Sequence, residues 1–251
     1  NGVVNYKQNN AVFQPTASVQ IDSLNINKTH LGNLNFDIAG DESFKKFALE
    51  ASIENENAES FDVNGNFEIV DKKTILDLQL KLNKFNLGML GSLGGEVLSN
   101  IRGLASGSAS IAGNLQKPEI NGRLYLEDGG LTIPYLNVDY ALGNRAIIDL
   151  TDEKFLFKNN VLTDTKYKTK GNLNGSIEHK VFSDWKLDLS VTSKKLLVLD
   201  TKDSEDAAYY GVAFINGLAT IKGPTDGLFI KVDAKSESGS SLKIPINNAE
   251  R

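Results

Sequence analysis

The chain has 251 residues, of which 40% are hydrophobic and 24% are charged. This composition is typical of a folded protein and argues against intrinsic disorder. The formal net charge of -5 leaves no basic stripe that could displace counterions from phosphates, so we expect no nucleic-acid partner. Cysteine is absent, which excludes disulfides and thiolate metal sites.

Apolar and polar residues alternate with a period of two through most of the chain, which predicts β-strands. In the first third the alternation covers residues 34–38, 47–53 and 63–69. It is cleanest in the next strand, whose apolar phase is Leu76, Leu78, Leu80 and Leu82. Because Lys81 and the other polar residues fall between the leucines, this strand should have one leucine face and one polar face.

The period changes within residues 85–104, where apolar residues recur at helical spacing. The apolar stripe comprises Leu90, Val97, Leu98 and Ile101. We therefore predict one short amphipathic helical segment in this range. Four glycines at positions 88, 91, 94 and 95 each cost about 1 kcal/mol relative to alanine in a helix. The segment should therefore depend on packing its stripe against an end of the sheet.

The central stretch, residues 103–140, combines the turn and strand signals that recur elsewhere. Pro118 precedes a strand whose apolar phase includes Ile120, Leu124 and Leu126. Asp128-Gly129-Gly130 is a turn signal, and Ile133 lies in the predicted strand that follows it. The alternation shifts phase near Pro134, which predicts a bulge or kink there.

Later strands repeat this design. Their apolar phases are Leu187, Leu189 and Val191, and then Leu228, Ile230 and Val232. Residues 110–113 and 220–223 are similar to each other, and each is followed by a proline-containing turn and an alternating strand. This self-similarity indicates stacked supersecondary units. About 15 strands joined by short turns predict an antiparallel meander in one long sheet.

The residues alone are compatible with two arrangements of the apolar faces. Two sheets could bury them against each other as a β-sandwich. A single strongly curved sheet could instead fold them into a trough. Large exposed apolar surfaces are rare on soluble proteins without a use.

The sequence carries no phosphate-binding loop and no zinc-protease, serine-hydrolase or dinucleotide motif. We therefore expect no enzyme activity, no cofactor and no metal. His30 and His179 each lie among polar residues and are interpreted as surface histidines. The acidic run 200–206 lacks the spacing of a calcium-binding EF-hand loop and predicts a solvated turn.

The chain begins at Asn1 and has no apolar run long enough to span a bilayer and no signal-peptide core. An apolar, strand-like run at residues 242–246 comes just before its C-terminus. We therefore interpret it as a fragment of a longer protein.

Loose patterns of glycine, proline and apolar spacing carry a family resemblance from residue 87 to about residue 245. The first eighty residues resemble the family only in their general character. They lie at residues 103–140, 162–164, 171–179, 182–189, 199–201, 209–214 and 241–245. In this order they resemble the TamB family of the translocation and assembly module, in the form found in Bacteroidetes. This family is grouped with the AsmA-like, or repeating β-groove, proteins.

The resemblance implies an all-β fold, in which residues 1–251 form part of a long, strongly curved antiparallel sheet, shaped like a taco with an apolar interior. It implies a periplasmic protein that is anchored in the inner membrane by a segment absent from this chain. It also implies passive transport of phospholipid acyl chains between the inner and outer membranes, and it supplies no catalytic residues.

On this interpretation the apolar phases line the groove. The candidate lining residues are Leu76, Leu78, Leu80, Leu82, Ile120, Leu124, Leu126, Ile133, Leu187, Leu189, Val191, Leu228, Ile230 and Val232. The main alternative is a scaffold for outer-membrane protein assembly, with a barrel partner of the BamA superfamily such as a TamA-like protein. An adhesin-like or glycan-binding module is disfavoured because few aromatic residues are expected at the surface.

Overall fold

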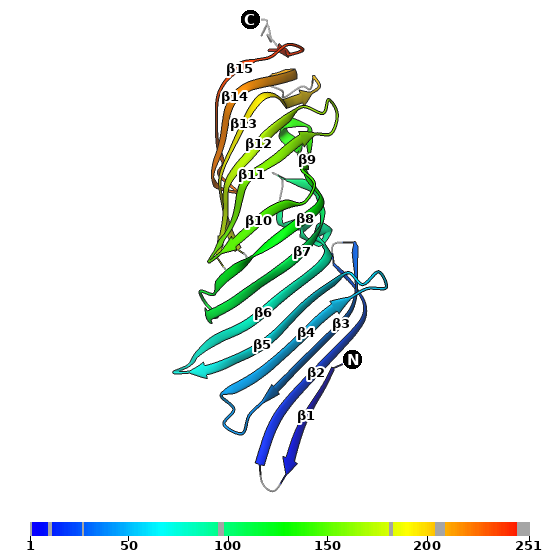
Figure 1. Ribbon diagram of the computed structural model, residues 1–251, viewed down its shortest axis with the longest axis vertical. Coiled ribbons are helices and arrows are strands. Elements are labelled where there is room, and N and C mark those ends of the chain that lie inside the picture. The colour runs from blue at the N-terminus through cyan, green and yellow to red at the C-terminus, as the bar shows by residue number, and fades with distance from the viewer. Residues whose placement is uncertain are drawn as a thin grey trace, which may run out of the picture.

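The computed structural model describes residues 2–9, 12–26, 28–94, 98–180, 183–203 and 209–244. All 16 described strands belong to one sheet in which every paired neighbour is antiparallel. Strands make up 78% of the structure, far above the 20–25% that is usual in globular proteins. Figure 1 shows the strands stacked in chain order, with β1 (Gly2–Asn9) toward one end of the long axis and β15 (Phe229–Ser236) toward the other. The prediction of a single antiparallel sheet is confirmed.

The strands follow one another as a meander. The first eight are β1 (Gly2–Asn9), β2 (Val12–Ile26), β3 (Thr29–Gly40), β4 (Lys46–Glu54), β5 (Ser60–Val70), β6 (Lys73–Asn86), β7 (Ser99–Asn114) and β8 (Glu119–Ile133). The others are β9 (Val138–Leu142), β10 (Ala146–Thr151), β11 (Lys154–Asp164), β12 (Lys170–Lys180), β13 (Ser183–Thr201), β14 (Tyr210–Pro224), β15 (Phe229–Ser236) and β16 (Ser241–Lys243). Strands β9 and β10 both lie between β8 and β11, so together they act as one interrupted strand.

Residues directly opposite each other on neighbouring strands point to the same face of a sheet. Leu78 of β6 lies opposite Gly65 of β5 and Ile111 of β7, whereas the next residue, Gln79, lies opposite Asn64 of β5. The sheet therefore has an apolar face and a polar face, and the alternation in the sequence assigns each residue to one of them.

A line of bulges crosses several strands on the same side of the sheet. At these points the pairing register shifts because one strand has an extra residue. A residue of that strand takes a positive φ angle: Ser23 in β2, Lys84 in β6, Asp128 in β8 and Asn159 in β11. A bulge bends its strand and increases the local twist. We call this line of bulges the crease. The short strand ends on one side of the crease form the flap, and the longer strand segments on the other side form the wall.

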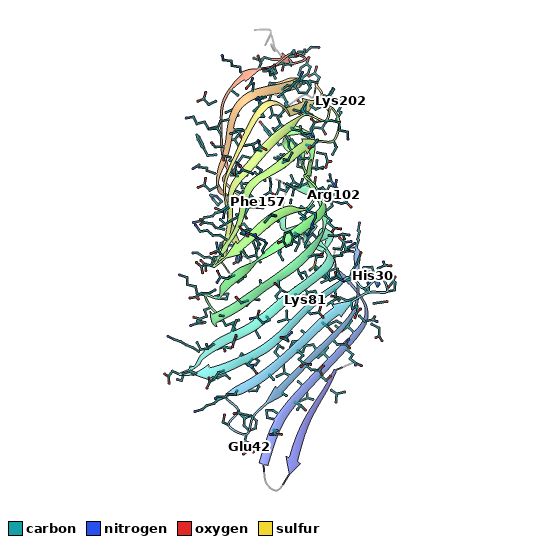
Figure 2. All side chains as sticks on the ribbon, in the orientation of Figure 1. His30, Glu42, Lys81, Arg102, Phe157 and Lys202 are labelled. Atoms are coloured by element: carbon teal, nitrogen blue, oxygen red, sulfur yellow. The ribbon has the colours of Figure 1, made fainter. Side chains whose placement is uncertain are left out.

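The crease runs parallel to the long axis, so the sheet has two lateral margins. Figure 2 shows His30, Arg102 and Lys202 on one margin and Glu42, in the turn after β3, on the other. The first is the flap margin and the second is the wall margin.

The accessible surface shows that the sheet does not close around a single core. A compact monomer of 27.3 kDa exposes about 11,000 Å², whereas this chain exposes 15,538 Å². The excess is expected of an elongated sheet in which much of the apolar face is left partly in contact with solvent.

The helical segment is shorter than the predicted range of 85–104. Strand β6 continues to Asn86, a 3-10 helix η1 (Leu87–Gly94) follows, and β7 begins at Ser99, so Ile101 lies in a strand. Val97 falls outside the described residues. Pairing of β7 with β6 and β8 outweighs the weak helical preference of a glycine-rich segment.

The predicted turn at Asp128-Gly129-Gly130 is also corrected. Strand β8 runs through these residues, and the positive φ of 51° at Asp128 belongs to a bulge. The chain instead reverses at the 3-10 helix η2 (Pro134–Leu136), after which Ile133 pairs with Val138. Because an Asp-Gly pair supplies a positive φ to turns and bulges alike, the sequence did not distinguish the two.

Candidate functional site

Two unbroken rows of apolar residues cross the apolar face from strand to strand, and we call them the apolar rows. The first row is Ile21, Leu34, Ile53, Phe61, Leu82, Gly107, Leu124, Ile148, Phe157, Gly175, Leu189, Ile221 and Ile230. The second row is Val19, Phe36, Ala51, Val63, Leu80, Ala109, Gly122, Leu150, Phe155, Ile177, Leu187 and Gly223. Each member is the direct register partner of the next.

The first row has thirteen members and therefore twelve steps between neighbouring strands. At about 4.8 Å a step, it extends for about 58 Å. Such a surface offers one apolar environment along the whole sheet, because no polar side chain interrupts the row.

The predicted site residues fall on the apolar face, with two differences at the C-terminal end. Leu80, Leu124 and Leu189 are members of the apolar rows and are partly exposed. Ile230 and Val232 have the predicted phase, but they are 49% and 53% exposed because β15 is the last strand in the order of the sheet. Leu228 lies in the turn before β15.

The other predicted residues share this face. Leu78, Leu82, Ile120, Leu126, Leu187 and Val191 are buried, whereas Leu76 and Ile133 are partly buried. The charged residues of the opposite phase, Lys81, Arg123, Lys186 and Lys231, are all exposed.

Sequence analysis missed the flap, which supplies much of the buried apolar surface. The central cluster is Leu31, Leu82, Phe85, Ala105, Leu126 and Ala146, against which Leu87 and Met89 of η1 pack. The C-terminal cluster is Val138, Tyr140, Leu162, Leu173, Val191, Leu196, Leu197 and Phe214. The bulges bring these residues together, and bulges have only a weak sequence signal.

Hydrogen bonds across non-adjacent strands hold the C-terminal cluster closed. The Tyr140 hydroxyl of β9 donates to the backbone carbonyl of Leu197 in β13 over 2.7 Å, although β11 and β12 lie between these strands. The Asn137 amide donates to the Asp200 carbonyl over 2.6 Å. Burial raises the pKa of Tyr140 far above its ordinary value, so its hydroxyl stays protonated.

The charges of the polar face are paired with each other. The Arg123 guanidinium donates to the Asp149 carboxylate over 2.6 Å. This hydrogen bond keeps the pKa of Asp149 below its ordinary value. The polar face also carries a hollow of about 510 Å³ over β3 to β5, lined by Asp37, Glu50, Asp62 and neighbouring residues. Its carboxylates make it unsuitable for a hydrocarbon chain.

One histidine differs from its expected position. His30 lies at the surface near Glu56, whereas His179 is only 3% exposed, with ring centroids 5.0 Å from Phe155 and 5.3 Å from Trp185. Burial lowers the pKa of His179 and favours its neutral form.

Among the described residues, no three acidic or histidine side chains are grouped as metal ligands. Residues 204–206 of the acidic run lie outside the described part.

An elongated, creased antiparallel sheet with one apolar and one polar face defines a β-groove protein. The family model of the TamB C-terminal domain matches residues 157–251. The match covers 95 of the 251 residues. It supports assignment of the chain to the TamB family, a non-enzymatic transport and assembly family. Its Bacteroidetes type stays a prediction. Neither the curated proteins nor the solved structures include a match to the chain.

Within the described residues, no helix has the length and apolar character needed to cross a membrane.

Proposed function

We propose that the chain carries phospholipid acyl chains along its apolar face, as part of a periplasmic protein that is anchored in the inner membrane and bridges to the outer membrane. The observation that carries this proposal is the pair of unbroken apolar rows. Most of their members are partly exposed, and each row continues across at least twelve strands. The family match supports the same class of function.

The energetics suit passive transport. Removing one methylene group from water contributes about 0.8 kcal/mol, so an acyl chain gains much by lying on an apolar face. Because successive row members are chemically similar, such as Leu34, Ile53 and Phe61, no position holds the chain much more tightly than the next. The sequence has no nucleotide-binding motif, so direction would have to come from another component.

Native mass spectrometry of the purified chain, after incubation with phosphatidylethanolamine vesicles, tests the proposal. We expect bound phospholipid with the unchanged chain and strongly reduced binding with Leu80→Arg, which places an ion in the second apolar row. The matched control is Gln79→Arg, one residue away on the polar face, which should bind as the unchanged chain does. Lipid-free protein, or equal binding by both variants, would contradict acyl-chain binding on this face.

A scaffold for outer-membrane protein assembly is the second candidate. The exposed strand β15 favours it, because all eight of its residues are exposed and it ends the strand order among the described residues. Such an edge can pair with a strand of another protein. Lipid-free protein that forms a stable complex with a BamA-superfamily barrel would support the scaffold over transport.

A further inference from the structure

We infer that His179 makes acyl-chain binding on the C-terminal half of the apolar face depend on pH: the neutral ring belongs to this face, and protonation puts a positive charge into it. This inference rests on the proposed function and adds how that binding is regulated. The position of His179, the rings around it and the charges near it support the inference.

His179 continues the apolar phase of β12. Leu173, Gly175 and Ile177 precede it at every second position, and Ile177 is a member of the second apolar row. Alternate residues of a strand point to the same face, so the His179 side chain lies on the apolar face, about 7 Å beyond Ile177 along the strand. A titratable group therefore stands directly beside the row that would carry hydrocarbon.

Two aromatic rings enclose the imidazole, which is only 3% exposed. Its ring centroid is 5.0 Å from that of Phe155, a member of the second apolar row, and 5.3 Å from that of Trp185 in β13. Aromatic rings attract a cation, but they replace only part of its hydration. The neutral imidazole thus packs as one of three rings, whereas the protonated one would have to draw in water or displace Phe155.

The charges near His179 do not outweigh its burial. Glu153, in the turn before β11, accepts the His179 amide N–H at its backbone carbonyl over 2.9 Å, and its carboxylate favours protonation. Burial has the larger effect, and the pKa of His179 is lowered. The other charged residues of this turn and of the adjoining strand ends lie on the polar face or at the surface: Asp152, Lys154, Glu178, Lys180, Asp184 and Lys186.

The lowered pKa fixes the direction of the effect on stability. The unfolded chain takes up this proton first, so the contribution of His179 is complete above pH 6.5, the ordinary value, and is lost as the pH falls toward the lowered pKa. Below pH 6.5, the melting temperature of the unchanged chain should fall by up to about 3–5 °C per pH unit more than that of His179→Phe. Parallel curves between pH 7.5 and pH 5 would contradict the inference.

Trp185 reports the protonation directly, because it is the single tryptophan of the chain and lies beside the His179 ring. Protonated imidazole quenches an adjacent indole, so the fluorescence of the unchanged chain should fall with a midpoint below pH 6.5. His179→Phe should lose this transition. The matched control is His30→Gln, at the only other histidine, which should keep it. Constant fluorescence from pH 7.5 to pH 5 would rule out the switch.

A phosphatidylethanolamine with a diazirine at the end of an acyl chain tests the effect on binding. Its headgroup keeps the same charge from pH 7.5 to pH 5, so a change in crosslinking comes from the protein. At pH 5, labelling of β11 to β13 relative to β4 to β6, which contain no histidine, should fall severalfold in the unchanged chain. The ratio should be the same at both pH values in His179→Phe. Because both sets of peptides belong to one molecule, the ratio cancels changes in solubility.

The outcomes separate the inference from the function on which it rests. An unchanged ratio, or an equal fall in His179→Phe, would overturn the pH dependence and leave acyl-chain binding intact. No acyl labelling of the rows at pH 7.5 would reject the proposed function itself, and the inference with it.

Discussion

The wall over β3 to β6 and the C-terminal cluster are made from strands of the same kind, but only the cluster is covered. Leu34, Phe36 and Val63 of the wall are partly exposed, whereas Leu197 of the cluster is 1% exposed. The difference comes from the backbone, because bulges fold the flap of the cluster onto itself. Strands of equal amphipathicity therefore form two arrangements: an uncovered apolar face and a closed core.

The largest expected difference comes from removing a large side chain in each region. Leu197→Ala leaves a cavity in a close-packed cluster and should lower the free energy of unfolding by about 2–5 kcal/mol. Leu34→Ala removes the same atoms from a partly exposed position and should cost about 1 kcal/mol, because less apolar area returns to water. Urea unfolding curves measure both. Equal losses would contradict the distinction between the covered cluster and the uncovered wall.

The next effect concerns a glycine within the apolar rows. Gly175 has a φ of +120°, and a Cβ atom there would lie 2.0 Å from the Asp188 carbonyl oxygen of the adjacent strand. Gly175→Ala should therefore cost about 1–3 kcal/mol, as strained backbone conformations do. Gly91→Ala is the matched control, since its Cβ would meet nothing within 4 Å. Unchanged thermal stability of Gly175→Ala would show that the strand does not need this conformation.

Alternation could predict the sheet, because the face of a residue follows from its place in the strand. It put Leu80 and Lys81 on opposite faces, and the structure places them so. The flap could not be predicted in this way. Each of these bulges uses one residue with positive φ, and Lys84 and Asn159 carry no local signal strong enough to reveal it.

The sequence pattern also could not predict burial that depends on segments distant in the chain. His179 lies among polar neighbours in the chain, but Phe155 and Trp185 from the adjacent strands enclose its ring. Likewise, the contact between Tyr140 and Leu197 joins residues 57 positions apart. Only the folding of the flap brings such pairs together.

A smaller effect is expected for Tyr140→Phe, which removes the hydroxyl that donates to the Leu197 carbonyl. The loss should be about 1 kcal/mol at neutral pH, the usual net contribution of one hydrogen bond. The pKa of Tyr140 is raised in the folded state, so its stabilising contribution is complete below pH 10, the ordinary value, and declines as the pH rises above it. Unfolding measured from pH 8 to pH 11 should therefore show a shallower alkaline loss in the variant. Parallel curves for the two proteins would contradict this.

The smallest effect is expected on the polar face, where Asp149→Asn removes the partner of Arg123. The pair lies at the surface, with half of the Arg123 side chain exposed, and exposed ion pairs contribute little because water and salt screen them. The pKa of Asp149 is held below its ordinary value of 3.8, so the pair stabilises the fold at neutral pH and loses this effect as the pH falls through the lowered pKa. We expect the variant and the unchanged chain to have nearly equal melting temperatures at pH 7, and a still smaller difference in high salt. A loss as large as that of Leu197→Ala would mean that stability resides in the polar face as much as in the cluster, and the contrast between the two regions would fail.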